Sequence, residues 1–144
     1  MRLIIQRVSS AKVTVDSQIT GQIGPGFLVL VGFGIGDNEP TVEKITAKLL
    51  KLRIMPDQNS KFNLSITDIG GEILVVSQFT LYAHLKGNRP SFTDSLEPNK
   101  ARQLYDYFIN KLKLSGLKVE SGIFGAYMKA DLTNDGPVTI IMES

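Results

Sequence analysis

The feature that most constrains the fold is a short, nearly uninterrupted apolar run, Phe27–Phe33, with the sequence FLVLVGF. The turn-forming segment Gly24-Pro25-Gly26 precedes it, and Gly34–Asn38 breaks it. Such a run is typical of a strand that is buried on both faces of its sheet. A second segment of the same kind, Glu72–Leu81, predicts another buried strand. The chain is therefore expected to fold around the interior of a sheet.

Alternating apolar and polar residues predict further strands. Arg2–Asp16 is expected to form one or two strands, and Gln18–Ile23 continues the pattern. Near the end of the chain, three closing strands are predicted over Leu117–Gly122, Tyr127–Leu132 and Val138–Met142. The sheet that these strands form is expected to be largely antiparallel.

Helical spacing occurs twice. Pro40–Leu52 places Val42, Ile45 and Leu49 on one face, and apolar residues from Ala101 to Leu112 mark the clearest helix. Between strand and helix, Tyr82–Glu97 has few periodic apolar residues and is expected to be a long, functional loop. The predicted fold class is α+β, with two amphipathic helices and largely antiparallel sheet.

Composition narrows the possible functions. The 144 residues favour a single domain spanning 1–144, and the absence of cysteine excludes disulfides and thiolate catalysis. A net charge of +2, from 16 basic and 14 acidic side chains, is far from the basicity of a domain that wraps DNA. No signal sequence or membrane span is evident, so a cytoplasmic protein without membrane or DNA partners is expected.

The usual catalytic devices are poorly represented. His84 is the only histidine, so any Ser-His-Asp triad would have to include it, and nothing in the sequence places it near an acid and a nucleophile. An exposed loop histidine is the simpler interpretation. The scattered carboxylates show no metal-ligand spacing, so no metal or cofactor is expected. Gly32–Gly36 has the sequence GFGIG but lacks the Walker lysine, which favours a turn after a strand.

Three polar side chains, Ser77, Gln78 and Thr80, interrupt the second buried strand. Polar groups in a core element cost free energy unless they find partners. They either cap the strand as it leaves the core or present hydroxyl, amide and backbone N–H groups to a ligand. The pattern alone does not separate these two interpretations.

Two later segments also carry possible chemistry. Asn134–Thr139, NDGPVT, has the composition of a turn, and a hairpin connection is the simpler interpretation. Lys86–Phe92, KGNRPSF, combines the cations Lys86 and Arg89 with the aromatic Phe92. Such a mixture suits contact with RNA phosphates and stacking on a base, while a solvated polar loop is the ordinary alternative.

Together, these segments resemble the D-aminoacyl-tRNA deacylase family, also called D-tyrosyl-tRNA deacylases. MRLIIQRVSSAKVTVD, GPGFLVLVG, SQFTL, KGNRPSF and NDGPVT occur in the family's order and span essentially the whole chain. The resemblance implies a barrel-like core and a homodimer with active sites at the subunit interface. It implies hydrolysis of the ester that joins a D-amino acid, or glycine, to the 3′ end of tRNA, without a cofactor.

The resemblance also implies roles for single residues. Gly136 and Pro137 match the family's Gly-cisPro dipeptide, which reaches into the partner's pocket, holds the substrate's α-amino group and excludes an L side chain. Arg7 matches an arginine that locks this dipeptide in place.

The SQFTL segment matches the part of the family's site that binds the scissile carbonyl through backbone N–H groups, here those of Phe79 and Thr80. Gln78 and Ser77 help to form the same substrate pocket. Thr80 matches a threonine once proposed as nucleophile, whereas attack by water assisted by the ribose hydroxyl of tRNA is the favoured alternative.

Two other functions fit parts of the sequence. A noncatalytic dimeric RNA-binding module would use the basic residues Lys86, Arg89, Lys100 and Arg102. A related deacylase for misattached L-alanine would carry a trans Gly-Pro bond. Tyr127 departs from the small acidic residue of many relatives, with a possible effect on the pocket rim or the interface.

Overall fold

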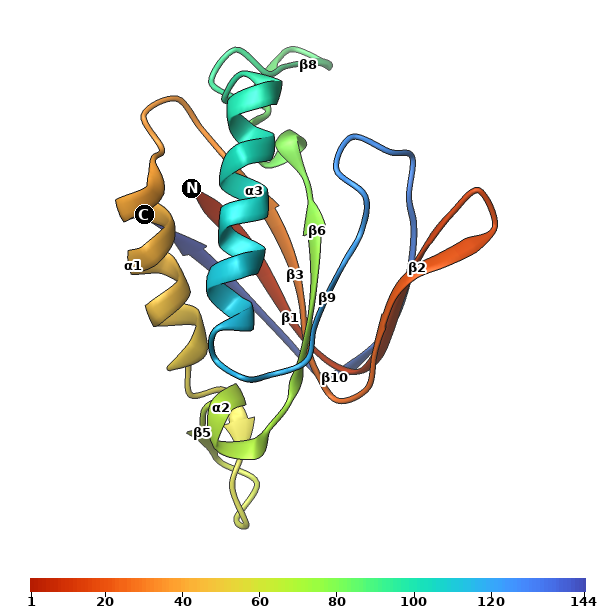
Figure 1. Cartoon of the computed structure of the whole chain (residues 1–144), viewed down its shortest axis with the longest axis vertical. Coiled ribbons are helices and arrows are strands. Elements are labelled where there is room, and N and C mark those ends of the chain that lie inside the picture. Colours follow the sequence, from red (N-terminus) through yellow and green to blue (C-terminus); the bar gives the residue numbers. More distant parts are fainter.

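The computed structural model describes residues 1–144, apart from the side chain of Lys86. One six-stranded sheet organises the chain and curls into a nearly closed, barrel-like shape (Figure 1). Its strands lie in the order β10-β1-β3-β6-β9, with β2 beside β1. They are β1 (Arg2–Val15), β2 (Gln18–Ile23), β3 (Gly26–Gly32), β6 (Glu72–Ser77), β9 (Val119–Ser121) and β10 (Lys129–Glu143). The predicted α+β class and barrel-like core are confirmed.

Strand β3 lies inside this sheet, as its apolar run predicts. It pairs antiparallel with β1 and parallel with β6, and β6 in turn pairs parallel with β9. The side chains of Phe27 and Val29 are fully buried. Because β3, β6 and β9 are parallel, their carboxyl ends lie at the same edge of the sheet.

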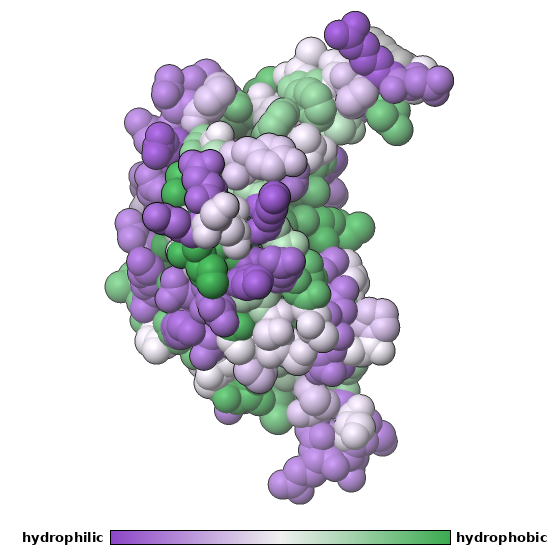
Figure 2. All heavy atoms as spheres, turned by 90° about the vertical axis from the view of Figure 1, so that its right-hand side faces the viewer, coloured by the Kyte–Doolittle hydropathy of each residue, from purple (hydrophilic) through white to green (hydrophobic). Residues whose placement is uncertain are grey.

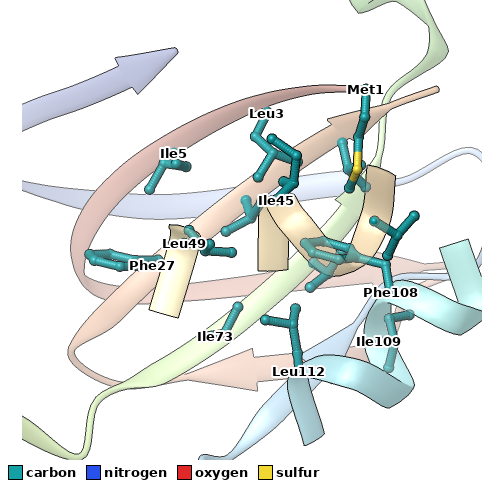
Figure 3. Close-up of a cluster of buried hydrophobic side chains, with 14 of the residues drawn as sticks. Met1, Leu3, Ile5, Phe27, Ile45, Leu49, Ile73, Phe108, Ile109 and Leu112 are labelled. Carbon is teal, nitrogen blue, oxygen red and sulfur yellow. The ribbon is translucent and has the colours of Figure 1, made fainter. Parts of the chain in front are cut away.

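The two predicted helices are present and cover one face of the sheet (Figure 1). Helix α1 (Glu39–Leu50) begins after Asn38, whose side chain accepts a hydrogen bond from the Thr41 N–H at 3.1 Å. Helix α3 (Pro98–Lys113) packs against α1. Side chains of both helices meet those of the sheet in the main core (Figure 3), which includes Leu3, Ile5, Phe27, Ile45, Leu49, Ile73, Phe108 and Leu112.

Several short elements fall where the sequence shows little periodicity. They are β4 (Met55–Pro56), β5 (Phe62–Leu64), helix α2 (Ile66–Ile69), the 3-10 helix η1 (Phe79–Tyr82), β7 (His84–Lys86) and β8 (Arg89–Ser91). The strand predicted over Glu72–Leu81 therefore ends at Ser77, because the chain turns into η1. The loop predicted over Tyr82–Glu97 contains the β7–β8 hairpin.

The end of the chain corrects two predictions. Only β9 lies within Leu117–Gly122, and the two strands expected over Tyr127–Leu132 and Val138–Met142 are one long strand, β10. Strand β1 is long enough to pair with both parts. Gln6 of β1 pairs with Thr139 of β10, but Val8, two residues later, pairs with Asn134. The residues of β10 between Asn134 and Thr139 therefore bulge out of the ladder. The expected NDGP turn is this bulge. No described helix is long and apolar enough to cross a membrane.

Candidate functional site

A cavity of about 680 Å³ opens beyond the carboxyl ends of β6 and β9. Ligands commonly bind at this edge of a sheet that contains parallel strands. Segments that are distant in sequence meet here, namely the end of β6, the chain after β9, and the start of α3. The lining residues are Leu30, Val76, Ser77, Gln78, Phe79, Phe92, Ser95, Leu96, Glu97, Pro98, Ala101, Phe124, Gly125, Ala126, Tyr127, Met128 and Ala130.

The cavity brings together two segments that the sequence singles out separately. Ser77, Gln78 and Phe79 line it from the end of β6, and Phe92 lines it from the chain after β8. The rings of Phe79 and Phe92 meet edge to face, with centroids 4.9 Å apart. Phe79 is 57% exposed although it is aromatic, so much of its surface is free for a ligand.

Helix η1 places unsatisfied backbone donors beside this cavity. The Gln78 N–H donates to the Val31 carbonyl at 2.7 Å, and the Leu81 N–H donates to the Gln78 carbonyl at 3.2 Å. Between them, the N–H groups of Phe79 and Thr80 have no acceptor among the atoms that the structure describes. The first N–H groups of any helix lack an intrahelical partner. They are therefore available to an acceptor from outside the chain.

The side chain of Thr80 is exposed and does not line the cavity. Its hydroxyl oxygen accepts a hydrogen bond from the side-chain amide of Gln78. The structure thus relates the predicted residues Gln78, Phe79 and Thr80 through one short helix rather than through one strand.

Arg7 holds the bulge in β10. Its guanidinium, buried within the protein, donates from Nε to the Asp135 carbonyl at 3.0 Å and from Nη1 to the Ile54 carbonyl at 2.7 Å. It also pairs with the Asp135 carboxylate at 3.2 Å. The next peptide bond, Gly136–Pro137, is cis, and Gly136 has φ +130°. Only glycine adopts that conformation readily.

Gly136 and Pro137 are both exposed, and neither lines the cavity of its own chain as the structure describes it. The structure therefore brings Arg7 to the Gly136 segment, but it does not bring this segment to Phe79 and Thr80 within one chain.

The predicted RNA-binding residues are only partly gathered. Arg89 is exposed on the β7–β8 hairpin, and the side chain of Lys86 lies outside the described residues. Lys100 and Arg102 are exposed at the start of α3, and the Arg102 guanidinium lies 6.0 Å from the Phe124 ring that lines the cavity.

His84 takes no part in the cavity. Its Nε2 lies 2.5 Å from the Asp94 carboxylate on the chain after the hairpin, and both side chains are exposed. The described side chains also contain no group of three or more histidines and carboxylates that could hold a metal ion.

Sequence reasoning missed part of the lining. Glu97, the N-cap of α3, accepts from the N–H groups of Asn99 and Lys100, which lowers the pKa of its carboxyl. Glu97 before Pro98 is a helix-start signal that could have located this wall. Phe124–Met128, the chain after β9, carries no such signal. Of this segment, only Tyr127 is singled out by the sequence, for an effect on the pocket rim or the interface; it lines the cavity and is 87% exposed.

Comparisons with known proteins agree with one another over the full chain. The family model described as D-Tyr-tRNA(Tyr) deacylase matches residues 4–143. D-aminoacyl-tRNA deacylases from Aquifex aeolicus and Thermosipho melanesiensis are 53% and 51% identical to this chain, cover all of it, and are themselves covered over 98% and 97% of their lengths.

Solved structures have the same fold. The c-Myc DNA Unwinding Element Binding Protein superposes with a TM-score of 0.94 at 40% identity, covering 100% of this chain and 99% of that one. A structure described as a probable eukaryotic D-amino acid tRNA deacylase has a TM-score of 0.87 at 18% identity, covering 98% and 97% of the two chains.

Proposed function

This chain belongs to the D-Tyr-tRNA(Tyr) deacylase family, and from that premise we propose that it hydrolyses the ester joining a D-amino acid to the 3′ end of tRNA. The products are the free D-amino acid and tRNA. The observation that carries the proposal is the pair of free backbone N–H groups on Phe79, which lines the cavity, and on the adjacent Thr80.

These two donors supply the electrostatic part of catalysis. When water attacks the ester carbonyl, negative charge develops on the carbonyl oxygen. Preorganised N–H groups that bind this oxygen contribute about 2.7–4 kcal/mol each to lowering the barrier. An aminoacyl ester is already activated, so this contribution suffices without a histidine triad. The neighbouring ribose hydroxyl of tRNA assists the attacking water.

A second copy of the chain completes the site. Strand β10 lies at the edge of the sheet, and the side chains of Lys129–Pro137 are all exposed. A long exposed edge strand is a surface that proteins normally cover. In the proposed homodimer, Gly136 and Pro137 of one protomer enter the cavity of its partner, while Arg7 fixes the backbone that carries them.

Chiral selection follows from this arrangement. The carbonyl groups of Gly136 and Pro137 accept hydrogen bonds from the substrate's α-ammonium group. With the ammonium group held there, an L side chain would collide with the backbone, whereas a D side chain points away. Selectivity thus comes from exclusion of the wrong substrate rather than from stronger attraction to the right one. Glycine has no side chain to exclude, so glycyl-tRNA is also a substrate.

The tRNA end approaches over the aromatic and basic side of the cavity. Phe79 and Phe92 offer apolar surface on which a base stacks, and Arg89 and Arg102 contact phosphates. These contacts position the ester over η1.

Release of free amino acid from D-Tyr-tRNA tests the proposal. The purified protein is expected to release D-tyrosine catalytically and to leave L-Ala-tRNA intact. Binding of tRNA without turnover would favour the noncatalytic RNA-binding module. Turnover of L-Ala-tRNA in place of D-Tyr-tRNA would favour the L-alanine deacylase.

A further inference from the structure

Two glycines at the end of β3 allow η1 to sit directly on the backbone of that strand. A Cβ atom added to Gly34 would lie 2.3 Å from Cε1 and 2.8 Å from the hydroxyl oxygen of Tyr82. A Cβ atom on Gly32 would lie 2.9 Å from the Gln78 carbonyl oxygen. Side chains at either position would push η1 away from β3. Gly32 and Gly34 of GFGIG thus allow η1 to pack closely against this part of the chain.

Arg2 holds the other end of the same short helix. Its Nη1 donates to the Leu81 carbonyl at 2.9 Å, and its guanidinium carbon lies 4.7 Å from the centroid of the Tyr82 ring. A cation at a helix C-terminus and over an aromatic face is attracted in both places. Arg2 also forms an exposed ion pair with Glu143 at 2.7 Å.

Asp37 links the backbone of Gly34 to the hydroxyl of Tyr82. Its Oδ2 accepts from the Gly34 N–H at 2.7 Å and lies 3.5 Å from the Tyr82 hydroxyl, and its Oδ1 lies 2.5 Å from the Met1 amino nitrogen. Burial, followed by the charge of Asp37, raises the pKa of Tyr82 to about 12. The neutral hydroxyl is the form that donates to Asp37.

None of these residues lines the cavity as the structure describes it. Arg2, Gly34 and Asp37 contact Leu81 or Tyr82 of the segment Gln78–Tyr82, which also carries the free N–H groups of Phe79 and Thr80. Resting on the function proposed above, we propose that Arg2, Asp37, Tyr82 and Gly34 form a clamp of positioning residues that fixes these two N–H groups for deacylation.

The clamp acts on the transition state because the N–H groups bind charge that develops only there. A shift of about 1 Å in a catalytic group costs up to about 100-fold in rate. Loosening η1 should therefore lower kcat more than it raises KM, because most of the cavity wall lies outside the segment Gln78–Tyr82.

The clamp is tested by steady-state kinetics on D-Tyr-tRNA with untagged protein. Gly34→Ala and Arg2→Gln are expected to lower kcat by about 10- to 100-fold, with a smaller rise in KM. Arg2→Lys retains a donor for the Leu81 carbonyl and should recover part of the loss. Glu143→Gln, the matched control, removes the exposed partner of Arg2 and should leave kcat unchanged. Arg2→Gln changes a partly exposed side chain, so it keeps the test valid if Gly34→Ala fails to fold.

Amide hydrogen exchange gives a readout that does not depend on turnover. The N–H groups of Leu81 and Ala83 close η1 on the carbonyls of Gln78 and Thr80. They should exchange at least about 10-fold faster in Arg2→Gln than in Glu143→Gln, because η1 opens more often.

The outcomes separate the clamp from the proposed function. Unchanged kcat in both clamp variants, or a change confined to KM, overturns the clamp while the deacylase stands. A wild-type protein without activity on D-Tyr-tRNA defeats the proposed function, and exchange then decides the clamp alone. An unchanged exchange rate of the Leu81 and Ala83 N–H groups in Arg2→Gln overturns the clamp.

Discussion

Thr80 is the residue whose chemical role the sequence leaves open, and its surroundings favour positioning over attack. Its hydroxyl oxygen already accepts a hydrogen bond from Gln78. A hydroxyl nucleophile also needs a base to take its proton. His84 is engaged with Asp94 and does not line the cavity. We therefore expect the backbone N–H of Thr80 to matter more than its side chain.

Thr80→Ala keeps that N–H and removes the hydroxyl. Losing one neutral hydrogen bond costs about 0.5–1.5 kcal/mol, so single-turnover release of D-tyrosine should slow by about 2- to 13-fold. If Thr80→Ala binds D-Tyr-tRNA normally but shows no turnover, the hydroxyl acts as the nucleophile.

Arg7 should contribute to both stability and selectivity. Arg7→Met leaves the carbonyls of Ile54 and Asp135 without their donor, so the free energy of unfolding should fall by about 2–4 kcal/mol in urea denaturation. The exposed Asp135 carboxylate contributes less, and Asp135→Asn should cost under about 1 kcal/mol.

Without the contacts from Arg7 to Asp135, the bulge in β10 should also hold the backbone of Gly136 less firmly. Arg7→Met should consequently raise the rate on L-Tyr-tRNA relative to D-Tyr-tRNA. Unchanged discrimination in a folded Arg7→Met protein would remove Arg7 from the account of selectivity.

At the scale of elements, apolar patterning predicts the strands and helices that make the core and fails where the chain leaves it. The run Phe27–Phe33 and the helix at Ala101–Leu112 are specified by burial, which periodicity reports directly. The end of β6 at Ser77 depends on a turn that packs against Gly32, the last residue of β3, and Gly34 just after it. The bulge at Asn134–Thr139 depends on the length of β1 beside it. Such long-range contacts leave no local pattern.

Glu72, at the start of β6, contacts the turn before β3 and the chain before β9, and it should make stability depend on pH in the acid range. Its carboxylate accepts from the Gly24 N–H at 2.8 Å and pairs with Lys118 at 2.9 Å, and these contacts, in that order, lower the pKa of Glu72. A lowered pKa in the folded protein adds stability that is full above the ordinary value of 4.5 and is lost as pH falls through the folded value.

Urea midpoints measured from pH 7 to pH 3 check this expectation. The wild type should lose stability below about pH 4.5, and Glu72→Gln should show a shallower fall over the same range. Equal slopes for the two proteins would show that Glu72 contributes no measurable linkage.

At the scale of the whole molecule, one chain carries both halves of the proposed site but keeps them apart. Figure 2 shows hydrophobic side chains at the surface, between hydrophilic projections at the upper and lower ends of the molecule. Exposed apolar residues include Ile123, Tyr127, Leu132 and Ile141. Together with the edge strand β10, they suit association with a second copy. Light scattering should give twice the chain mass of 15.8 kDa, and a monomer at working concentration would contradict the shared site.

Complementation tests the sharing itself. Phe79→Ala damages the cavity, and Gly136→Val damages the donated segment, where a Cβ would lie 2.8 Å from Val138 Cγ2. Each variant alone should turn over D-Tyr-tRNA more slowly than the wild type, yet a mixed dimer holds one site with both parts intact. Co-expression should restore turnover of D-Tyr-tRNA. No recovery in isolated mixed dimers would place both parts within one chain.

The sequence predicts the α+β class and identifies two of the segments that reach the cavity, those of Ser77–Phe79 and Phe92, because motifs and core patterning are local. It does not predict which segments share a cavity, because Phe92, Glu97 and Phe124 meet only after folding. That residues 1–144 form a single domain stays a prediction.

Competing hydrolysis of D-Tyr-tRNA and L-Tyr-tRNA by the same preparation tests the central claim most directly. The ratio of kcat/KM values for the two substrates is the quantity to measure. The exclusion mechanism predicts efficient release of D-tyrosine and no release of L-tyrosine above the uncatalysed rate. Equal values of kcat/KM for the two substrates would contradict it.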